Sequence, residues 1–442
     1  MNDVVIRAGT LVTPSGLHRA DLAIDDGTIS EVSVDAPGGK EEIDAAGLLV
    51  FPGVIDVHLH FNEPGRTEWE GAATGSRAFA AGGGTLFFDM PLNSAPCTVN
   101  PEAFDRKRAA LEASSITDFA LWGGLIPGSV SQMAAMAARG VVGFKAFMCD
   151  SGLPEFPRVD DLTLLDGLRE AARLALPVAV HAESEELTRG LRERITSRTV
   201  RAFLDSRPVV AELEAIQRAL LIATEAGASL HIVHVSCGRG VRLAAEARAR
   251  GTDVSVETCP HYLFFTEEDV ERLGPIAKCA PPLRAASDQH ELWDELEHGH
   301  VQIVASDHSP APPAMKSGDF FEAWGGIGGV QSTLPVLLEA GHHGRELPLE
   351  RICTLVAAEP ARRFRVHGKG SLEPGMDADL VLVDLNRRTT LAANALHQRH
   401  AVTPYLGHSF RGVVRRTIRR GITIYNDGRV TGTSGGRLIR PS

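Results

Sequence analysis

The arrangement of apolar runs in the middle of this chain restricts its fold more than any other feature. Between residues 53 and 365, short runs rich in Val, Ile, Leu and Phe alternate with segments of helical periodicity, such as residues 212–223. Eight strand–helix units over roughly 310 residues predict an α/β protein with a (β/α)8 TIM barrel. The eight expected strands lie near residues 54–60, 85–90, 118–124, 141–147, 177–182, 229–235, 253–257 and 301–306.

An open, doubly wound sheet is the alternative that the same alternation allows. Such a sheet normally has a glycine-rich turn after its first strand, where it holds a phosphate. Here the first strand is followed by residues 61–66, Phe-Asn-Glu-Pro-Gly-Arg, and the glycines at 82–84 precede their strand. We therefore favour the barrel, in which reactive groups lie at the carboxyl ends of the strands.

The two ends of the chain have a different pattern from the middle. Short apolar runs separated by turns such as 25–27 make up the first 52 residues, and the same pattern returns near residue 366. We predict a small β-sandwich domain formed by both termini, residues 1–52 and 366–442, beside a barrel domain of residues 53–365.

Residues able to bind a divalent metal lie at the ends of five predicted strands. His58 and His60 are two positions apart, so both rings project from the same face of the first strand. A His-x-His pair alone is a common chance pattern, but the later strands add further residues of this kind. Because a barrel gathers its strand ends at one mouth, we predict six metal ligands. They are His58, His60, Lys145, His181, His234 and Asp307.

Lys145 is unusual among these candidates because an ammonium repels metal ions. Lysine is scarce, with six among 45 basic residues, yet Lys145 lies between Phe144 and Phe147 in a strand-like run. Burial would lower the pKa of its amine and leave a neutral nucleophile that can capture carbon dioxide. The resulting carbamate has two oxygens and can bridge a metal pair. We therefore predict that Lys145 is carbamylated and that two divalent ions are bound, zinc first, with manganese, cobalt and iron as alternatives.

This ligand set predicts a hydrolytic reaction. A water that bridges two ions has a lowered pKa and supplies hydroxide near neutral pH, while the metals polarise a substrate carbonyl. Asp307 is expected to act as the general acid/base that passes a proton to a leaving nitrogen. The chemistry is that of amide hydrolysis.

Composition excludes several other classes of protein. Six cysteines lie far apart without a Cys-x-x-Cys pair, which indicates a reducing compartment. A net charge of −11 without basic clusters argues against a nucleic-acid partner. The chain starts without a secretory signal, and no uncharged apolar stretch approaches the roughly 18 residues of a membrane span. We expect a cytoplasmic protein that acts on a small molecule.

The pattern of His-x-His, strand lysine, two later histidines and a final aspartate resembles the amidohydrolase superfamily. Within it, the chain is similar to the cyclic amidohydrolases, over nearly its whole length. The resemblance implies a homodimer or homotetramer and a division of the ligands between two ions. These are His58, His60 and Asp307 for one ion, His181 and His234 for the other, and carbamylated Lys145 for both.

The position after the His-x-His pair separates members of that family. Dihydroorotases usually have an arginine two residues after the second histidine, where it pairs with the substrate carboxylate; this chain has Asn62. Several short sequence segments are instead most similar to the allantoinase group. This resemblance implies hydrolysis of the cyclic amide of allantoin to allantoate. These segments lie at residues 63–71, 90–94, 278–284, 307–313 and 323–329.

A neutral hydantoin ring calls for hydrogen bonds rather than a cation. Asn62, Asn93 and Ser309 lie near the ends of strands one, two and eight and offer such groups, so we predict that they bind the substrate. The alternatives are a hydantoinase or dihydropyrimidinase, then a dihydroorotase, or a noncatalytic homologue that acts as a scaffold.

Other polar residues near the expected strand ends are interpreted mainly as structural. We expect His261 and His308 to have structural roles, and His231 to pack on the opposite face from the metal ligands. Glu183, two residues after His181, either orients that ligand or forms an ordinary salt bridge in a loop.

Two residues further along the chain are also assigned to structure. Arg207, which precedes a proline, is expected to cap and brace a helix. Trp324, beside the glycines of residues 325–329, is expected to belong to a loop near the mouth rather than to a binding surface.

Overall fold

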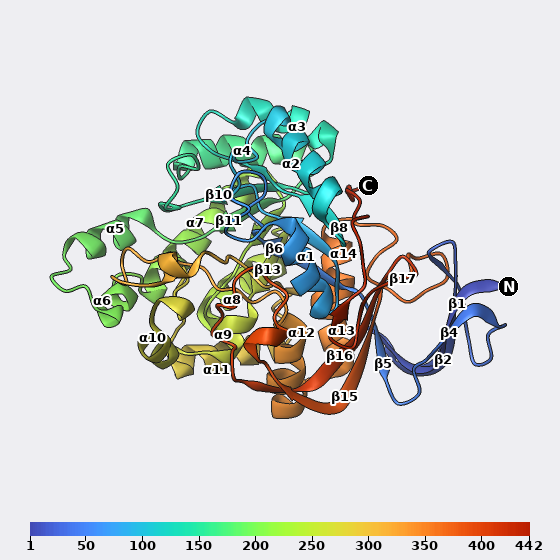
Figure 1. The fold of residues 1–442 in the computed structure, drawn as a ribbon. Coiled ribbons are helices and arrows are strands. Elements are labelled where there is room, and N and C mark those ends of the chain that lie inside the picture. The colour runs from blue at the N-terminus through green and yellow to red at the C-terminus, as the bar shows by residue number, and fades with distance from the viewer.

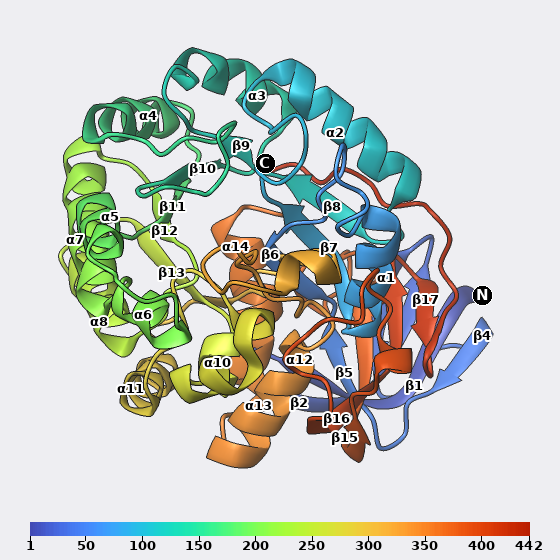
Figure 2. The same ribbon diagram turned by 60° about the vertical axis from the view of Figure 1, so that its left-hand side comes forward.

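In the computed structural model, which describes residues 1–442, the middle of the chain forms a ring of parallel strands surrounded by helices (Figure 2). Each predicted apolar run supplies one strand of this ring, and Trp122 interrupts the third, which is drawn as β8 and β9. The strands are β6 (Val54–Leu59), β7 (Gly84–Asp89), β8 (Asp118–Leu121), β9 (Gly123–Gly124), β10 (Phe144–Phe147), β11 (Val178–His181), β12 (Leu230–Ile232), β13 (Val254–Thr258) and β14 (Ile303–Val304).

Backbone hydrogen bonds close the ring. Strands β6 to β8 pair in order, as do β9 to β14, and every pair is parallel. The first and last strands meet where the His60 N–H donates to the His308 carbonyl at 2.8 Å. Between the two sheet parts, the Val142 N–H donates to the Leu121 carbonyl at 2.9 Å. The predicted (β/α)8 barrel is therefore confirmed, and its strand ends face one mouth.

Helices connect consecutive strands and cover the outside of the ring (Figure 2). The outer helices are α1 (Ala72–Ala81), α2 (Pro101–Ser114), α3 (Met133–Arg139), α4 (Asp161–Arg173), α7 (Val209–Ala226), α8 (Gly238–Ala249), α11 (Ala286–Glu297), α12 (Thr333–Val336), η4 (Leu337–His343), α13 (Leu349–Cys353), η5 (Thr354–Ala358) and α14 (Glu359–Arg363). Side-chain caps begin two of these helices: the Asn100 side chain accepts from the Ala103 N–H at α2, and the Asp160 side chain accepts from the Thr163 N–H at α4.

Further helices lie in the connecting loops. They are α5 (Glu185–Glu193), α6 (Val200–Asp205), α9 (Pro260–Phe264), α10 (Glu267–Leu273), η1 (Val130–Gln132), η2 (Gly274–Ala277), η3 (Pro313–Lys316) and η6 (Ala393–Ala395). None of the helices combines the length and the apolar character needed to span a lipid bilayer.

The two ends of the chain pair in one nine-stranded sheet beside the barrel (Figure 1). Strand β5 joins them, because it pairs in parallel with β1 and antiparallel with β15. The strands are β1 (Asn2–Thr13), β2 (Gly16–Asp25), β3 (Thr28–Ser33), β4 (Gly39–Asp44), β5 (Leu49–Pro52), β15 (Leu380–Thr390), β16 (Ser409–Arg419), β17 (Ile422–Asn426) and β18 (Arg429–Val430).

This terminal sheet folds back on itself. The Ile29 N–H donates to the Met376 carbonyl, and the Ala378 N–H donates to the Gly27 carbonyl, both at 2.8 Å. One apolar cluster of 14 residues draws on both halves, with Ile29 from the first and Ile418 from the last part of the chain. The small β-sandwich of both termini is confirmed, while the domain boundaries at residues 52 and 366 stay a prediction.

A buried lysine lies at the junction of barrel and terminal sheet, which we call the seam. The Lys369 Nζ is 2.7 Å from Asp118 at the start of β8, 2.7 Å from Asp379 and 2.8 Å from Asp377. Arg420, which follows β16, pairs with the same Asp118. The seam is thus held by charged groups in contact with one another.

Candidate metal centre and its cavity

A cavity of about 410 Å³ lies at the carboxyl ends of the barrel strands. Five of the six predicted ligands line it, and the sixth, Lys145, is fully buried. The lining ligands are His58, His60, His181, His234 and Asp307.

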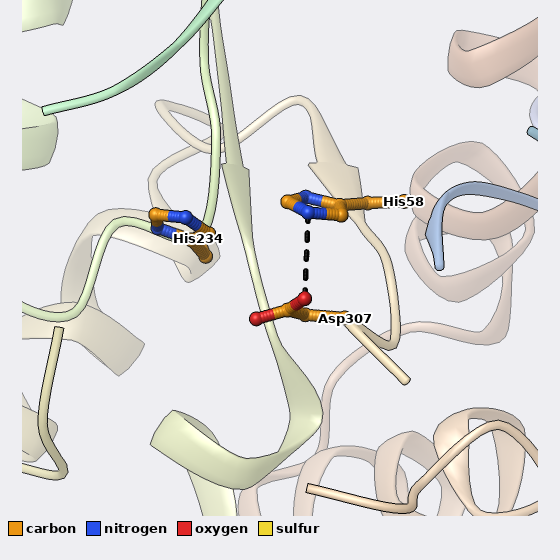
Figure 3. Close-up of side chains that lie close together, drawn as sticks. All are labelled: His58, His234 and Asp307. Atoms are coloured by element: carbon orange, nitrogen blue, oxygen red, sulfur yellow. Dashed lines mark ion pairs between the residues drawn. The ribbon is translucent and has the colours of Figure 1, made fainter. Parts of the chain in front are cut away.

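Three side chains from distant parts of the chain form the centre of this group (Figure 3). The ligand-type atoms of His58, His234 and Asp307 all lie within 4.8 Å of one another. Asp307 Oδ1 is 3.4 Å from His58 Nε2 and 3.5 Å from His60 Nε2. Good hydrogen bonds are shorter than this, so these atoms point towards a common space rather than satisfying one another.

The second group of imidazoles lies beside the first. His181 Nδ1 is 3.0 Å from His234 Nε2, and the His234 ring centroid is 5.4 Å from that of His58. Burial lowers the pKa of His60 to about 4 and also lowers the pKa of His181 and His234. These rings are therefore neutral near pH 7, which is the form that binds metals.

Lys145 is the only buried lysine without a hydrogen-bond acceptor. Its Nζ has no partner and lies 5.1 Å from the Phe147 ring, which stacks on His181 with centroids 4.6 Å apart. Burial lowers the pKa of Lys145 to about 8, although the charges of Glu257 and Asp307 partly oppose the shift. The amine thus faces the histidine group and is partly neutral near pH 7.

The backbone is left-handed at several site residues. Positive φ angles occur at Asn62 (61°), Asn93 (68°), His234 (40°) and Asp307 (43°). Such angles are uncommon outside glycine and cost free energy that the surrounding fold must offset. They occur just beyond the strand ends, where they direct each side chain independently of strand alternation.

A buried glutamate that sequence reasoning missed orients the first histidine. Glu257, in β13, lies 2.8 Å from His58 Nδ1 and 3.1 Å from His231 Nε2, and His231 Nδ1 lies 2.8 Å from Ser255. Burial alone would raise the pKa of Glu257, but His58 and His231 outweigh it and lower this pKa to about 2. A lone carboxylate in an apolar strand was the available signal. Carboxylate contacts of this kind fix the orientation of a ligating imidazole.

Glu183 has the corresponding position in the second group. Its carboxylate is 2.8 Å from His181 Nε2, and Arg207 pairs with the same carboxylate. Both interpretations of Glu183 are thus observed, the contact with His181 and a salt bridge, here with Arg207. The expectation for Arg207 is wrong, because this side chain lines the cavity and holds Glu183 instead of bracing a helix.

The three predicted substrate contacts are placed differently from one another. Asn93 and Ser309 line the cavity, and Asn93 Nδ2 donates to Ser309 Oγ at 3.4 Å. Asn62 is 1% exposed, donates to the Pro310 carbonyl at 3.5 Å and is not among the residues that line the cavity. Asn93 and Ser309 are thus the two that face the space available to a substrate.

Two further histidines lie close to the site. His308 Nδ1 accepts from the Gly329 N–H at 3.1 Å, which agrees with the expected structural role. His261 is fully buried, neither ring nitrogen has a partner, and its ligand atoms lie within 4.8 Å of those of Cys259 and Asp307. His261 therefore lies beside Asp307 at the edge of the site.

The donor set fits divalent metal ions. The site combines neutral imidazoles with a carboxylate, and burial leaves His60 Nδ1, His234 Nδ1 and Lys145 Nζ without partners. Buried polar atoms without partners are costly, so a group that binds them stabilises the site. Nitrogen and oxygen donors of this kind suit first-row ions such as zinc.

A parallel barrel with histidines and an aspartate gathered at its mouth defines the class of metal-dependent barrel hydrolases. The family model described as "Amidohydrolase family" matches residues 49–424. The chain belongs to this family.

Named relatives resemble the chain over its full length. It is 64% identical to an allantoinase of Solibacter usitatus, covering 100% of this chain and 97% of the relative. It is 57% identical to an allantoinase of Rubrobacter xylanophilus, covering 99% and 98%. Among solved structures, the L-hydantoinase (dihydropyrimidinase) of Arthrobacter aurescens matches with a TM-score of 0.97 and 34% identity, covering 100% of both chains.

Proposed function

We propose that this chain hydrolyses the cyclic amide of allantoin to give allantoate, as a cytoplasmic enzyme of purine nitrogen salvage and as a homodimer or homotetramer. The observation that carries the proposal is the full-length likeness to allantoinases. The cavity supports it, since Asn93 and Ser309 offer neutral hydrogen-bonding groups beside the histidines.

Two divalent ions would be held by the six predicted ligands. We assign His58, His60 and Asp307 to one ion, His181 and His234 to the other, and the Lys145 carbamate to both. Zinc is the first choice, with manganese, cobalt and iron as alternatives. When bound, such ions lower the pKa of a water molecule and polarise a carbonyl.

Lys145 enters this arrangement through its amine. The neutral amine forms a bond to the carbon of carbon dioxide and releases one proton, which gives a carbamate whose single negative charge is shared by two oxygens. The pKa of about 8 supports this step, because it raises the fraction of neutral amine near pH 7. No carboxylate lies within ion-pair distance to hold the ammonium form.

Asp307 is assigned the proton transfers. Burial alone would raise its pKa, but the neighbouring His58 and His60 hold that pKa well below its usual value. Asp307 is therefore ionised near pH 7 and can accept a proton from the attacking water. It then returns the proton to the ring nitrogen as the carbon–nitrogen bond breaks, which leaves a carboxylate and a free urea nitrogen.

The choice of substrate is tested by comparing four cyclic amides with the metal-loaded protein. Allantoin, hydantoin, dihydrouracil and dihydroorotate are presented in parallel, and kcat/KM is measured for each. We expect the highest value for allantoin. A preference for hydantoin or dihydrouracil would favour the hydantoinase alternative, which the Arthrobacter structure supports, and a preference for dihydroorotate would overturn our interpretation of Asn62.

Metal analysis separates an enzyme from a scaffold. The purified, metal-supplemented protein is expected to contain about two ions per chain. Less than one ion per chain, together with no turnover of any of the four amides, would favour a noncatalytic homologue.

A further inference from the structure

Arg207 enters the cavity from the segment between α6 and α7. Its Nη1 pairs with Glu183, and the Glu183 carboxylate lies 2.8 Å from His181 Nε2. The guanidinium carbon is 5.8 Å from the centre of the Phe203 ring, and the side chains of Arg207 and Phe203 both line the cavity. The carboxylate and the ring thus hold the guanidinium in place, with only Glu183 between it and a predicted metal ligand.

Two nitrogens of this guanidinium are free to donate. The hydrogen bond to Glu183 uses Nη1, and Nε and Nη2 donate to no oxygen of the protein. Neither of these two nitrogens is covered by protein atoms, and the side chain as a whole is 19% exposed. The neighbouring Cys149 thiol is a weak acceptor. An oxygen on a molecule in the cavity can therefore reach these donors.

The surroundings of Arg207 favour a neutral acceptor. Its positive charge is already paired with the Glu183 carboxylate, so a second anion would gain less than it would at an unpaired cation. Donors on a charged group still form stronger hydrogen bonds than neutral donors do. Arg192, the other arginine of the lining, is exposed and forms no ion pair that would hold it in place. Arg207 is thus the fixed donor to a carbonyl oxygen.

We propose that Arg207 is a specificity-determining residue, whose free N–H groups donate to a carbonyl oxygen on the substituent next to the scissile amide. The inference rests on the proposed function and deepens it. In allantoin, the ureido tail leaves the ring at the carbon that is bonded to the scissile carbonyl, so the tail oxygen lies only a few bonds from the reacting carbon. A substrate held beside His181 therefore brings this oxygen towards Arg207. Hydantoin has no tail and makes no such contact.

The test is Arg207→Lys, which keeps a cation for Glu183 and removes the planar set of donors. Values of kcat/KM are measured for allantoin and for unsubstituted hydantoin, and metal content is determined on the same sample. We expect the ratio of the two values, allantoin over hydantoin, to fall about fivefold or more, the size of one hydrogen bond. Metal content should stay at the wild-type level.

Arg201→Lys is the matched control. Arg201 also pairs with carboxylates, Glu267 and Glu271, but it does not line the cavity. This variant should change the ratio less than about twofold, since it alters only exposed ion pairs. An equal fall of the ratio in both variants would overturn the inference.

Equal losses on both substrates with Arg207→Lys would also overturn it, because Arg207 would then act only through Glu183 and His181. A second measurement needs no variant. The wild-type kcat/KM should be at least about fivefold higher for allantoin than for 5-propylhydantoin, whose tail is of similar length but lacks the carbonyl. Equal values would contradict a contact with the tail oxygen. Failure of the metal-loaded wild-type protein to hydrolyse allantoin would instead contradict the proposed function.

Discussion

The mouth of the barrel and the seam each bury a lysine, but they surround it differently. At the seam, Lys369 contacts Asp118, Asp377 and Asp379 within 2.8 Å. Burial alone would lower the pKa of Lys369, yet these carboxylates raise it well above its usual value. At the mouth, Lys145 has no partner, and burial lowers its pKa to about 8. One lysine is held as a cation by three carboxylates, and the other has no group that holds its charge.

The same difference separates Lys145 from every other buried lysine. Five of the six lysines are buried, and four of them donate to carboxylates or backbone carbonyls. Burial of a lysine is thus common in this chain, and the lack of an acceptor is what distinguishes Lys145. The buried lysines are Lys107, Lys145, Lys278, Lys316 and Lys369.

The largest expected effect follows from removing the unpaired lysine. Lys145→Ala should reduce kcat/KM for allantoin by at least about a thousandfold, because Lys145 and the other ligands are proposed to hold the metal ions together. Thermal unfolding of the metal-free protein should change little, since no ion pair is lost. Lys145→Arg keeps the positive charge, but its guanidinium group cannot form a carbamate. This variant should be as inactive as Lys145→Ala. An arginine variant with a tenth of the wild-type activity or more would break the comparison.

At the seam, removing the lysine should instead lower the stability of the fold. Lys369→Met would leave the buried Asp379 without its cation and Asp118 with Arg420 alone, and it should destabilise the fold by about 3–5 kcal/mol. The midpoint of urea unfolding measures this loss. Lys40→Met, which removes an exposed pair with Asp3, is the control and should leave the midpoint nearly unchanged. Equal midpoints for the two variants would contradict the structural role of Lys369.

At the mouth, carboxylates orient imidazoles instead of neutralising a lysine. Glu257→Gln removes the charge behind His58 and should weaken metal affinity about 10- to 100-fold. Competition with a chelator measures the affinity. Ser255→Ala, which acts on His58 only through His231 and Glu257, should have a smaller effect. The account of Glu257 fails if its variant binds metal as tightly as the wild type.

The smallest effect is expected at Asn93, which offers an uncharged hydrogen-bonding group to the cavity. Asn93→Ala should lower kcat/KM for allantoin about two- to tenfold, as expected for one lost hydrogen bond, with metal content unchanged. Steady-state kinetics and metal analysis on the same sample decide the point. Unchanged kinetics would remove Asn93 from the substrate site.

The barrel and the positions of the ligand candidates follow from local patterns, because strand ends are marked by where apolar runs stop. The prediction for Asn62 used only its nearness to the end of the first strand, but β6 ends at Leu59, and Asn62 has a positive φ and does not line the cavity. Contacts between strands far apart in the sequence could not be predicted, because local patterns do not show which strands face each other. His58 and Glu257 lie 199 residues apart, and only the closed barrel places one behind the other.

Detection of the carbamate tests the central claim most directly. The metal-loaded protein is equilibrated with ¹³C-labelled bicarbonate and examined by ¹³C NMR, in parallel with Lys145→Ala. We predict one carbamate carbonyl resonance in the wild-type protein, lost on acid unfolding and missing from the variant. An active, metal-loaded wild-type protein without that resonance would contradict the account.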